Sequence, residues 1–398
     1  MSRFLFVVPP LAAHVHPTAA VGAELVDRGH VVAWAGHVDH IRPMLPAGAR
    51  LIEVGYPDDG AAEPVGSRQW GESMQSRRQG MRGPTAFRFL WEEFLIPLAT
   101  SMVAGVEAAV DDFCPDVMAV DQHTLAGALV ARARRLPWAT LAIMSAELVD
   151  APGPKLQAWV TERVNGFVRR FDDLGADTSE AGDLRFSEHL VLAFTTAALV
   201  GPLERFPDHY RFVGPSIYPR GGGDFPWDRL DPARHHVLLT LGTVAGDVGQ
   251  RFISTAIEAV EPMTDRIQLI VAAPPGSIDS SGADVLVRDF VPYLELLPHL
   301  DLVVCHAGHT TTCEALAFGV PLVVAPIRDD NPVVAGQVQR AGAGIRVKFG
   351  RVRAAELREA IVTVLDDPSY HRAALRVQAS FKAAGGAVAA ADSLEKLA

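Results

Sequence analysis

Short apolar runs alternate with helix-like stretches along this chain, and the pattern stops once and then starts again. Near the N-terminus, the apolar run Phe4–Val8 is followed by helical spacing over Thr18–Arg28, and after Gly29 comes a second apolar run, Val31–Trp34. Continuous apolar runs are typical of strands that are covered on both faces, and their alternation with helices favours a parallel sheet. Three further runs continue the pattern: Val117–Val120, Ala139–Met144 and Leu190–Phe194.

A segment rich in glycine and proline, Val213–Pro232, interrupts this pattern and has the composition of a linker. Strands are then expected again at His236–Leu241, Ile267–Val271, Val285–Asp289, Leu302–Cys305, Leu322–Ala325 and Gly344–Val347, and helices at Val248–Val260, Thr310–Phe318 and within Ser369–Leu397. The length of 398 residues also favours two domains. We therefore predict an α/β protein with two Rossmann-like lobes, in which the carboxyl ends of the strands surround a shared cleft. The expected parts are a first domain at 1–213, a linker at 214–232, a second domain at 233–375, and a C-terminal helix at 376–398 that packs back on the first domain.

The composition narrows the class of protein. Hydrophobic residues make up 49% and charged residues 21%, which is an ordinary globular mix, and the net charge of −11 disfavours nucleic acid and anionic lipid as partners. The cysteines, Cys114, Cys305 and Cys313, form no paired motif, so we expect free thiols in a reducing compartment. The run Phe4–Leu11 is too short for a signal peptide, and no stretch reaches the roughly 18–20 apolar residues of a membrane span. We therefore expect a cytoplasmic protein without integral membrane association.

The second half contains the most informative motif. The expected strand Leu302–Cys305 ends in the small and polar run His306–His309, and three threonines starting at Thr310 then open the next helix. A strand, a tight turn and a hydroxyl-rich helix start favour an anion site, because free backbone N–H groups and the helix dipole face the ligand. Glu314 lies four residues after Thr310, on the same helix face, where a carboxylate suits ribose hydroxyls better than phosphate.

This region resembles the donor-binding signature of the UDP/dTDP-sugar-dependent glycosyltransferase superfamily, of the type found in antibiotic, macrolide and plant secondary metabolism. The residues that match the pattern are Phe290, Pro292, Asp301, His306, Gly308, Thr311, Glu314, Ala315, Leu316, Gly319, Val320, Pro321, Pro326 and Asp330. The resemblance implies a GT-B fold, in which two Rossmann-like lobes face a central cleft. It also implies a set of donor-binding residues, in which Glu314 binds ribose, Phe290 stacks on the base and Asp330 and Asn331 contact the sugar. His306, Gly308 and Thr311 would bind the diphosphate, and Thr243 matches a further phosphate contact. The donor-binding set also includes Val291, His309 and Thr310.

Several positions depart from the superfamily's pattern. Tyr293 replaces a glutamine near the base, and His309 and Thr310 fill positions that are usually small. Asn331 stands where a glutamine usually follows the aspartate, and Val334 stands where an asparagine is common. Variation at these positions resembles enzymes that use deoxysugar donors. The implied donor is therefore a dTDP- or UDP-linked deoxyhexose or glucose.

Two histidines of the first half, His14 and His16, precede Pro17 in what we expect to be a loop between the first strand and the first helix. Transfer of a sugar to a hydroxyl with inversion needs one base, and an imidazole titrates near neutral pH. The stretch from His14 to Pro17 fits the superfamily's H-x-x-P pattern, with Ala13 in place of a glycine. The resemblance implies that His14 is the base and that His16 is secondary.

A base of this kind benefits from a carboxylate that orients the imidazole and stabilises its charged form. Asp121 directly follows the expected strand Val117–Val120 and matches the superfamily's aspartate that pairs with the histidine. Asp116, which opens the same strand, is expected to be structural. The implied reaction is a single displacement, in which His14 and Asp121 activate the acceptor, and His306 with the helix start at Thr310–Thr312 stabilises the leaving diphosphate.

No D-x-D, H-E-x-x-H or paired-cysteine motif occurs, so we expect no metal ion and no cofactor beyond the nucleotide-sugar co-substrate. A sugar-nucleotide 2-epimerase on the same fold and a non-catalytic homologue that activates a partner enzyme remain alternatives. The second of these would be expected to lose the base and the phosphate-binding histidine. An NAD-dependent dehydrogenase is disfavoured because no G-x-G-x-x-G follows a strand.

The acceptor is not identified by any motif. The loops Tyr56–Pro84 and Ser145–Asp183 are expected to shape its pocket. The polar composition of Tyr56–Pro84 fits either a substrate lid or a plain surface loop. The apolar stretch Phe87–Leu98 indicates a hydrophobic aglycone as the small-molecule acceptor. A homodimer is compatible with the sequence, which has no feature that tests it.

Overall fold

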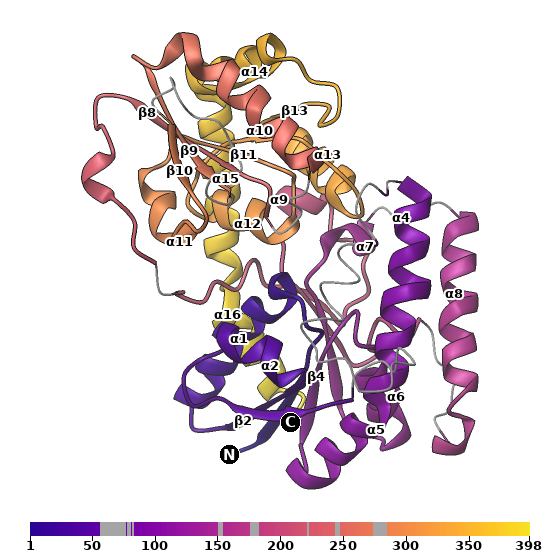
Figure 1. The fold of residues 1–398 in the computed structure, drawn as a ribbon. Coiled ribbons are helices and arrows are strands. Elements are labelled where there is room, and N and C mark those ends of the chain that lie inside the picture. Colours follow the sequence, from indigo (N-terminus) through magenta and orange to yellow (C-terminus); the bar gives the residue numbers. More distant parts are fainter. Residues whose placement is uncertain are drawn as a thin grey trace. The chain divides into compact units, whose positions relative to one another are not determined.

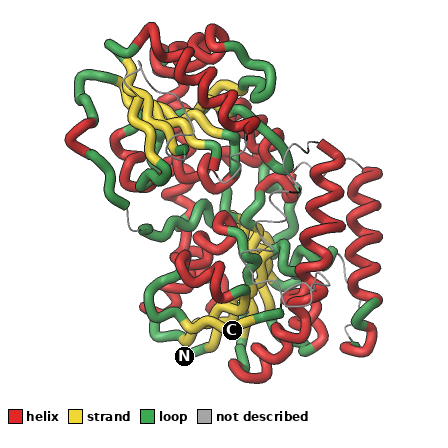
Figure 2. Tube along the Cα trace, viewed as in Figure 1, coloured by secondary structure: helices red, strands yellow, loops and turns green. Residues whose placement is uncertain are grey.

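The computed structural model describes residues 1–55, 77, 81, 83–149, 154–175, 183–220, 223–242, 247–273 and 285–398. The chain divides into two compact units. Unit 1 comprises Met1–Thr196, Pro202–Tyr218 and Ala384–Ala398, and unit 2 comprises Ala197–Gly201 and Pro219–Ala383. Each unit is built on a parallel sheet with helices packed against it (Figure 1). Figure 2 distinguishes the strands of the two sheets, in yellow, from the helices and loops by colour. Most of the expected lid, Tyr56–Pro84, lies outside the described residues.

The sheet of unit 1 has seven strands in the order β3-β2-β1-β4-β5-β6-β7. In chain order these are β1 (Arg3–Val7), β2 (Val31–Gly36), β3 (Arg50–Glu53), β4 (Val117–Asp121), β5 (Trp138–Ala142), β6 (Leu190–Ala193) and β7 (Tyr210–Phe212). The helices of this unit are α1 (Ala12–Asp27), α2 (Val38–Ile41), α4 (Gly83–Phe89), α5 (Ile96–Phe113), α6 (Leu125–Ala133), α7 (Ser145–Val149), α8 (Pro154–Arg169) and α16 (Gly386–Glu395). All described strand pairs are parallel, as the continuous apolar runs predict.

The sheet of unit 2 has six strands in the order β10-β9-β8-β11-β12-β13. These are β8 (His235–Thr240), β9 (Ile267–Ala272), β10 (Val285–Arg288), β11 (Leu302–Cys305), β12 (Leu322–Val324) and β13 (Gly344–Arg346). The helices are α9 (Ala197–Val200), α10 (Asp247–Val260), α11 (Tyr293–Leu296), α12 (His309–Ala317), α13 (Asn331–Ala341), α14 (Ala354–Asp366) and α15 (Pro368–Ala384). If β8 is counted as the first strand, this order repeats that of the first six strands of unit 1. Both sheets therefore have the doubly wound Rossmann topology.

Successive strand residues point to opposite faces of a sheet, so each sheet has two apolar cores. In unit 1, Phe6 packs in one core with Leu25 of α1, and Val7 packs in the other with Met102 of α5. Unit 2 repeats this arrangement with residues of β11 on either face. Burial of each such side chain stabilises the fold by roughly 1.5–3 kcal/mol. The sheets are thus rigid supports for the loops at their carboxyl ends.

The first helix begins earlier than the sequence indicates. We expected His14 and His16 to lie in a loop, with Pro17 in the first turn of the helix, but α1 begins at Ala12 and contains all three residues. Proline lacks an N–H group, which costs a helix one hydrogen bond, and it is tolerated best near the N-terminal end. The hydroxyl of Thr18, the next residue, donates to the carbonyl of Val15 at 2.7 Å in the same turn. The early start places His14 on a rigid helical turn.

One described helical stretch, Thr85–Phe113, is long and apolar enough by composition to cross a membrane, and 56% of its most apolar window is buried. It includes a π-helical segment, Leu90–Leu95. Trp91, Leu95 and Leu98 are fully buried in the core of unit 1. Core packing therefore accounts for the apolar composition of much of Phe87–Leu98, and the hydrophobic acceptor stays a prediction.

The C-terminal segment divides between the two units. Helix α15 belongs to unit 2, and α16 packs on unit 1 beside α1, with Ala390, Ala391 and Leu394 in the same core as Phe6. Arg28 fixes this position because its guanidinium binds Asp392 and Glu395 of α16 at 2.6 and 2.7 Å. His30 adds a contact to Glu395 at 2.7 Å.

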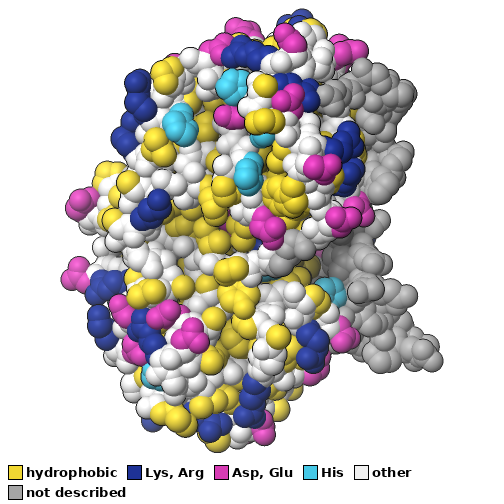
Figure 3. Space-filling view, turned by 90° about the vertical axis from the view of Figure 1, so that its left-hand side faces the viewer, with side chains coloured by type: hydrophobic (Ala, Val, Ile, Leu, Met, Phe, Trp, Pro, Cys, Tyr) yellow, Lys and Arg dark blue, Asp and Glu magenta, His cyan; other side chains and the backbone are white. Residues whose placement is uncertain are grey.

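The charged surface is mixed elsewhere: on the face in Figure 3, the described Lys and Arg side chains lie among Asp and Glu and form no continuous basic stripe.

Candidate active site

The strand order predicts where each unit binds a ligand. In unit 1 the order reverses between β1 and β4, where Val7 pairs with Val120, and in unit 2 it reverses between β8 and β11, where Cys305 pairs with Thr240. Doubly wound sheets bind ligands just beyond the carboxyl ends of their strands at such a reversal. The residues expected from the sequence lie at both points. In unit 1, His14 comes after β1 and Asp121 is the last residue of β4, and in unit 2 His306 directly follows β11.

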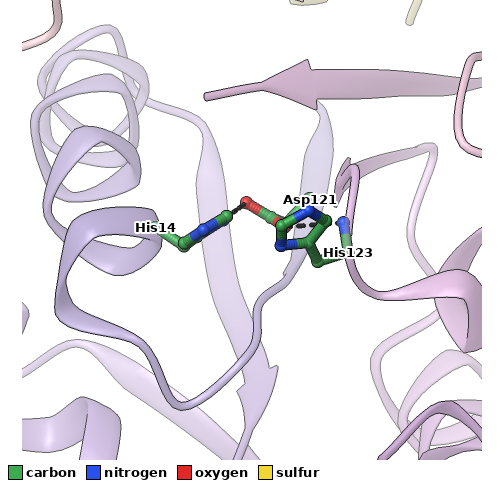
Figure 4. A group of neighbouring side chains, drawn as sticks. All are labelled: His14, Asp121 and His123. Carbon is green, nitrogen blue, oxygen red and sulfur yellow. Dashed lines mark hydrogen bonds and ion pairs between the residues drawn. The ribbon is translucent and has the colours of Figure 1, made fainter. Parts of the chain in front are cut away.

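The first of these points holds a buried histidine–aspartate pair. His14 Nδ1 donates to Asp121 Oδ2 at 2.8 Å, and the two side chains are 4% and 0% exposed. A carboxylate only accepts hydrogen bonds, so Nδ1 carries the hydrogen and Nε2 is the nitrogen left to accept a proton. Figure 4 shows His14 reaching Asp121 from a helix, while Asp121 is supported by its strand. The pair is built as an oriented base, as in hydrolase triads.

A second histidine lies beside this pair and was not predicted from the sequence. Asp121 Oδ1 accepts the backbone N–H of His123 at 2.9 Å, and the rings of His14 and His123 have centroids 4.8 Å apart. One aspartate therefore fixes both histidines, the first through its side chain and the second through its backbone (Figure 4).

The side chain of His123 begins a buried chain of charges. Its Nε2 lies 2.7 Å from Glu147 Oε1, and Glu147 Oε2 accepts from Arg185 at 3.3 Å. Arg185 in turn forms a two-pronged contact with Asp183. Burial disfavours the charged form of both partners, but each stabilises the charge of the other, so the pKa of Glu147 falls to about 2 and that of His123 rises. The two shifts favour the imidazolium form of His123 and the carboxylate form of Glu147.

Among the described residues, His14, Asp121 and His123 form a group that could hold a metal ion. They form a buried group whose ligand atoms all lie within 4.8 Å of one another. In the structure these atoms are used by hydrogen bonds instead, His14 with Asp121 and His123 with Glu147. The group is therefore accounted for as two hydrogen-bonded pairs.

The reversal point of unit 2 holds His306. Glycines lie on both sides of its ring: a Cβ atom at Gly242 would be 3.0 Å from Cε1, and one at Gly308 would be 2.6 Å from Nε2. Burial and the nearby charge of Arg328 lower the pKa of His306 to about 4, so the ring is neutral at pH 7. Its Nδ1 is buried without a hydrogen-bond partner among the described residues. A confined, unsatisfied imidazole of this kind is suited to a ligand that brings negative charge.

Helix α12 starts directly beyond His306, with Gly308 as its N-cap and no side chain capping it. Thr310 and Thr311 are partly exposed, whereas Thr312 is fully buried, so only the first two of the three expected threonines can offer hydroxyls to a ligand. Ala307 has a φ of +64°, a left-handed conformation that costs a residue other than glycine roughly 1–3 kcal/mol. The turn before α12 is therefore held in a strained conformation, which fixes the direction in which the helix starts.

Glu314, the expected ribose ligand, is 5% exposed and already has a partner. Arg220 Nη2 donates to Glu314 Oε1 at 2.6 Å. Burial raises the pKa of Glu314, while Arg220 opposes that change by favouring the carboxylate. Sequence reasoning missed Arg220 because it lies in the segment whose composition marks a linker, and no motif surrounds it.

The other expected donor-site residues differ in their surroundings. Phe290 is 58% exposed, as a ring that stacks on a base must be, whereas Val291 is buried in the core of unit 2. Tyr293 donates its hydroxyl to the carbonyl of Thr311 at 2.8 Å, and burial raises its pKa well above the usual range. Its position beside α12 is therefore structural.

Three further positions complete the predicted set. Asn331 is buried, accepts the backbone N–H of Arg328 at 3.2 Å and donates to Asp330 Oδ1 at 3.1 Å. His309 is buried, with Nε2 3.5 Å from the Cys313 sulfur. Thr243 lies outside the described residues. Of the predicted set, His306, Gly308, Thr310, Thr311 and Glu314 gather at the start of α12, and Phe290 is presented at the surface of the same unit.

Comparisons with known proteins found relatives and solved structures that are similar over nearly the whole chain. Residues 270–397 match a family model described as "Erythromycin biosynthesis protein CIII-like, C-terminal domain". The chain is similar to the uncharacterized UDP-glucosyltransferase YojK of Bacillus subtilis (strain 168), with 31% identity over 414 residues that cover 99% of this chain and 97% of that protein. It is 29% identical to demethyllactenocin mycarosyltransferase of Streptomyces fradiae, over 100% of this chain and 87% of that protein. Among solved structures, that of the glycotransferase of kitacinnamycin is similar, with a TM-score of 0.79, 22% identity, and coverage of 100% and 99%.

Proposed function

Because this chain belongs to the UDP/dTDP-sugar-dependent glycosyltransferase superfamily and has the GT-B fold, we propose a specific transfer reaction for it. The enzyme moves a deoxyhexose or glucose from a dTDP- or UDP-sugar to a hydroxyl of a small hydrophobic natural product. The transfer is a single displacement with inversion and requires no metal ion. His14 is the base, and Asp121 orients it.

The observation that carries this proposal is the hydrogen bond between His14 and Asp121. A buried imidazole whose Nδ1 is fixed at 2.8 Å by a carboxylate presents Nε2 as the proton acceptor. When Nε2 takes the acceptor's proton, the imidazolium that forms is stabilised by Asp121, which does not need to move. General-base catalysis of this kind contributes roughly 100-fold to 10,000-fold to a rate.

The donor half of the proposal is supported by the start of α12. No side chain caps this helix, so the backbone N–H groups of its first turn and the hydroxyls of Thr310 and Thr311 suit the two phosphates, and His306 adds a further donor. Glu314, steered by Arg220, accepts hydrogen bonds from ribose, and the exposed ring of Phe290 stacks on the base. As the bond to the sugar breaks, this set of donors stabilises the growing charge of the diphosphate.

A transfer assay with His14→Ala tests the proposal. Purified enzyme is incubated with dTDP-glucose or UDP-glucose and a panel of phenolic acceptors, and glycoside is measured by chromatography. We expect His14→Ala to lower the transfer rate at least 100-fold without loss of donor binding, and Asp121→Asn to lower it similarly. His189→Ala, a change of an exposed histidine in the same unit, serves as the control.

Two further measurements separate this proposal from its competitors. Transfer that persists after EDTA treatment supports the metal-independent reaction, whereas rescue by added Mg²⁺ or Mn²⁺ would contradict it. Thermal-shift assays with dTDP and UDP distinguish the donor classes, since a ligand at 100 times its Kd stabilises the fold by about 2.7 kcal/mol. Donor consumption without glycoside formation would point to epimerisation instead.

A further inference from the structure

The ion pair of His123 and Glu147 lies next to the proposed base, but the transfer reaction described above makes no use of it. His123 is 4% exposed, and its ring centroid is 4.8 Å from that of His14. Its Nε2 is taken by Glu147 at 2.7 Å. Its Nδ1 is buried and has no hydrogen-bond partner among the described residues.

The state of His123 determines what this free nitrogen can do. Glu147 is held as a carboxylate, and Asp121 adds a second negative charge near the ring, while Arg185 opposes them from beyond Glu147. The two carboxylates outweigh the effect of burial and raise the pKa of His123, which favours the imidazolium form with a proton on each nitrogen. Nδ1 is then a charged hydrogen-bond donor in a fixed position.

An ion pair that served only to join segments would not need an unpaired donor at Nδ1 of His123. Leaving a buried donor unsatisfied costs roughly 1–3 kcal/mol, and more for a charged group. Among the described residues no side chain pairs with Nδ1, although Nε2 is bound by Glu147, which is held in turn by Arg185 and Asp183. The partner of Nδ1 therefore arrives with a ligand.

We propose that His123 is a specificity-determining residue that donates a hydrogen bond from Nδ1 to an oxygen of the acceptor, next to the hydroxyl that His14 deprotonates. This inference rests on the proposed function and adds the chemical class of its acceptor. Two tilted imidazoles whose centroids are 4.8 Å apart can each reach one of two oxygens on neighbouring carbons. The preferred acceptors are thus vicinal diols, catechols and hydroxyls beside a carbonyl group.

Matched acceptors test this proposal directly. The probes are 2-naphthol, 2,3-dihydroxynaphthalene and 3-acetyl-2-naphthol, which share one ring system and differ in the neighbouring oxygen. For the natural enzyme we expect kcat/KM to be roughly tenfold to 100-fold higher for the two dioxygenated probes, mainly through a lower KM. His123→Phe keeps the ring shape and removes the donor, so these ratios should fall to about one.

A second variant separates charge from shape. Glu147→Gln keeps an oxygen that accepts from Nε2 but removes the negative charge, so His123 becomes neutral and Nδ1 becomes an acceptor. The preference for 3-acetyl-2-naphthol should then vanish, because a carbonyl cannot donate, while the preference for the diol should survive. His236→Phe is the matched control, since this buried histidine has both nitrogens paired, with His299 and Asp231 carbonyls, and its loss should leave the ratios unchanged.

The outcomes bear on separate claims. Unchanged acceptor ratios in His123→Phe would overturn the role of His123 even if His14→Ala abolishes transfer. Equal kcat/KM for all three probes in the natural enzyme would overturn it as well. Should His123→Phe fail to fold, the result with Glu147→Gln decides, because loss of both preferences or of neither contradicts the proposal. An enzyme that glycosylates no probe, and whose binding of the three probes does not differ, would count against both proposals.

Discussion

Protonation of His306 should couple donor binding to pH. The pKa of its imidazole is about 4 in the free protein, because burial and Arg328 disfavour the charged form. The ring lies close to the backbone at Gly242 and Gly308, and its Nδ1 has no hydrogen-bond partner among the described residues. A unit negative charge at about 4 Å and an effective dielectric constant of about 20 favours the imidazolium by roughly 4 kcal/mol. An effect of that size brings the protonation of His306 in the complex into the neutral range.

The sign of the effect follows from linkage. A group whose pKa rises on binding takes up a proton with the ligand, so binding tightens as the pH falls through the pKa of the complex. We expect the Kd for dTDP-glucose to fall by about tenfold between pH 8 and pH 6. A sugar nucleotide is the right ligand, because its esterified diphosphate does not itself titrate in this range.

Isothermal titration calorimetry measures both the affinity and the proton uptake, by comparison of buffers with different ionisation enthalpies. His306→Gln should bind with a pH-independent Kd close to that of the natural enzyme at pH 8. His299→Gln, a change of an exposed histidine in the same unit, should behave like the natural protein. A Kd that does not change with pH in the natural enzyme, or a dependence that persists in His306→Gln, would refute the reasoning.

Three further predictions concern stability and packing. Glu147→Gln should lower the free energy of unfolding by about 3 kcal/mol near pH 6, because the lowered pKa of the Glu147 carboxyl stabilises the fold. That contribution is fully present above pH 4.5 and is lost as the pH falls toward 2. In urea titrations the difference between the two proteins should therefore vanish at low pH. Gly308→Ala should weaken dTDP binding at least tenfold in calorimetry and cost about 1–3 kcal/mol, because its Cβ would lie 2.6 Å from His306, whereas Gly336→Ala in α13 should leave binding unchanged. Arg28→Ala should lower stability by no more than about 1 kcal/mol and speed amide exchange in α16, and a smaller effect at high salt would identify the cause as charge.

The sheets could be predicted from the sequence because their strands are buried on both faces. A run such as Leu302–Cys305 has no polar residue to place on a solvent face, so its length and apolar character suffice to identify it. The short edge strand β3 has two exposed positions among four residues and gives no such signal. Helix starts were less certain, and Pro17 misled the prediction because proline is usual in a first turn yet tolerated further in.

The site was predictable only where a motif carried it. His14 and Asp121 were found through local patterns, although 107 residues separate them, and their hydrogen bond bears out the pairing. Arg220 and His123 have no such pattern, since each is defined by a partner far along the chain that only folding brings near. Apolar composition likewise cannot tell a pocket from a core, so the packing of Phe87–Leu98 in the core of unit 1 had to come from the structure.

The division of the chain between the units has a consequence for synthesis. Unit 2 is made almost entirely of one continuous stretch, 219–383, whereas α16, a helix of unit 1, is translated only after that stretch. Until α16 is made, part of the apolar surface of α1 and its sheet remains exposed to solvent. In the folded protein this surface is covered by Ala390, Ala391 and Leu394. Domains generally fold as units as the chain emerges, so the half that is translated first is the one completed last. A stop codon after residue 383 would therefore damage the N-terminal half of the protein, the half that carries His14.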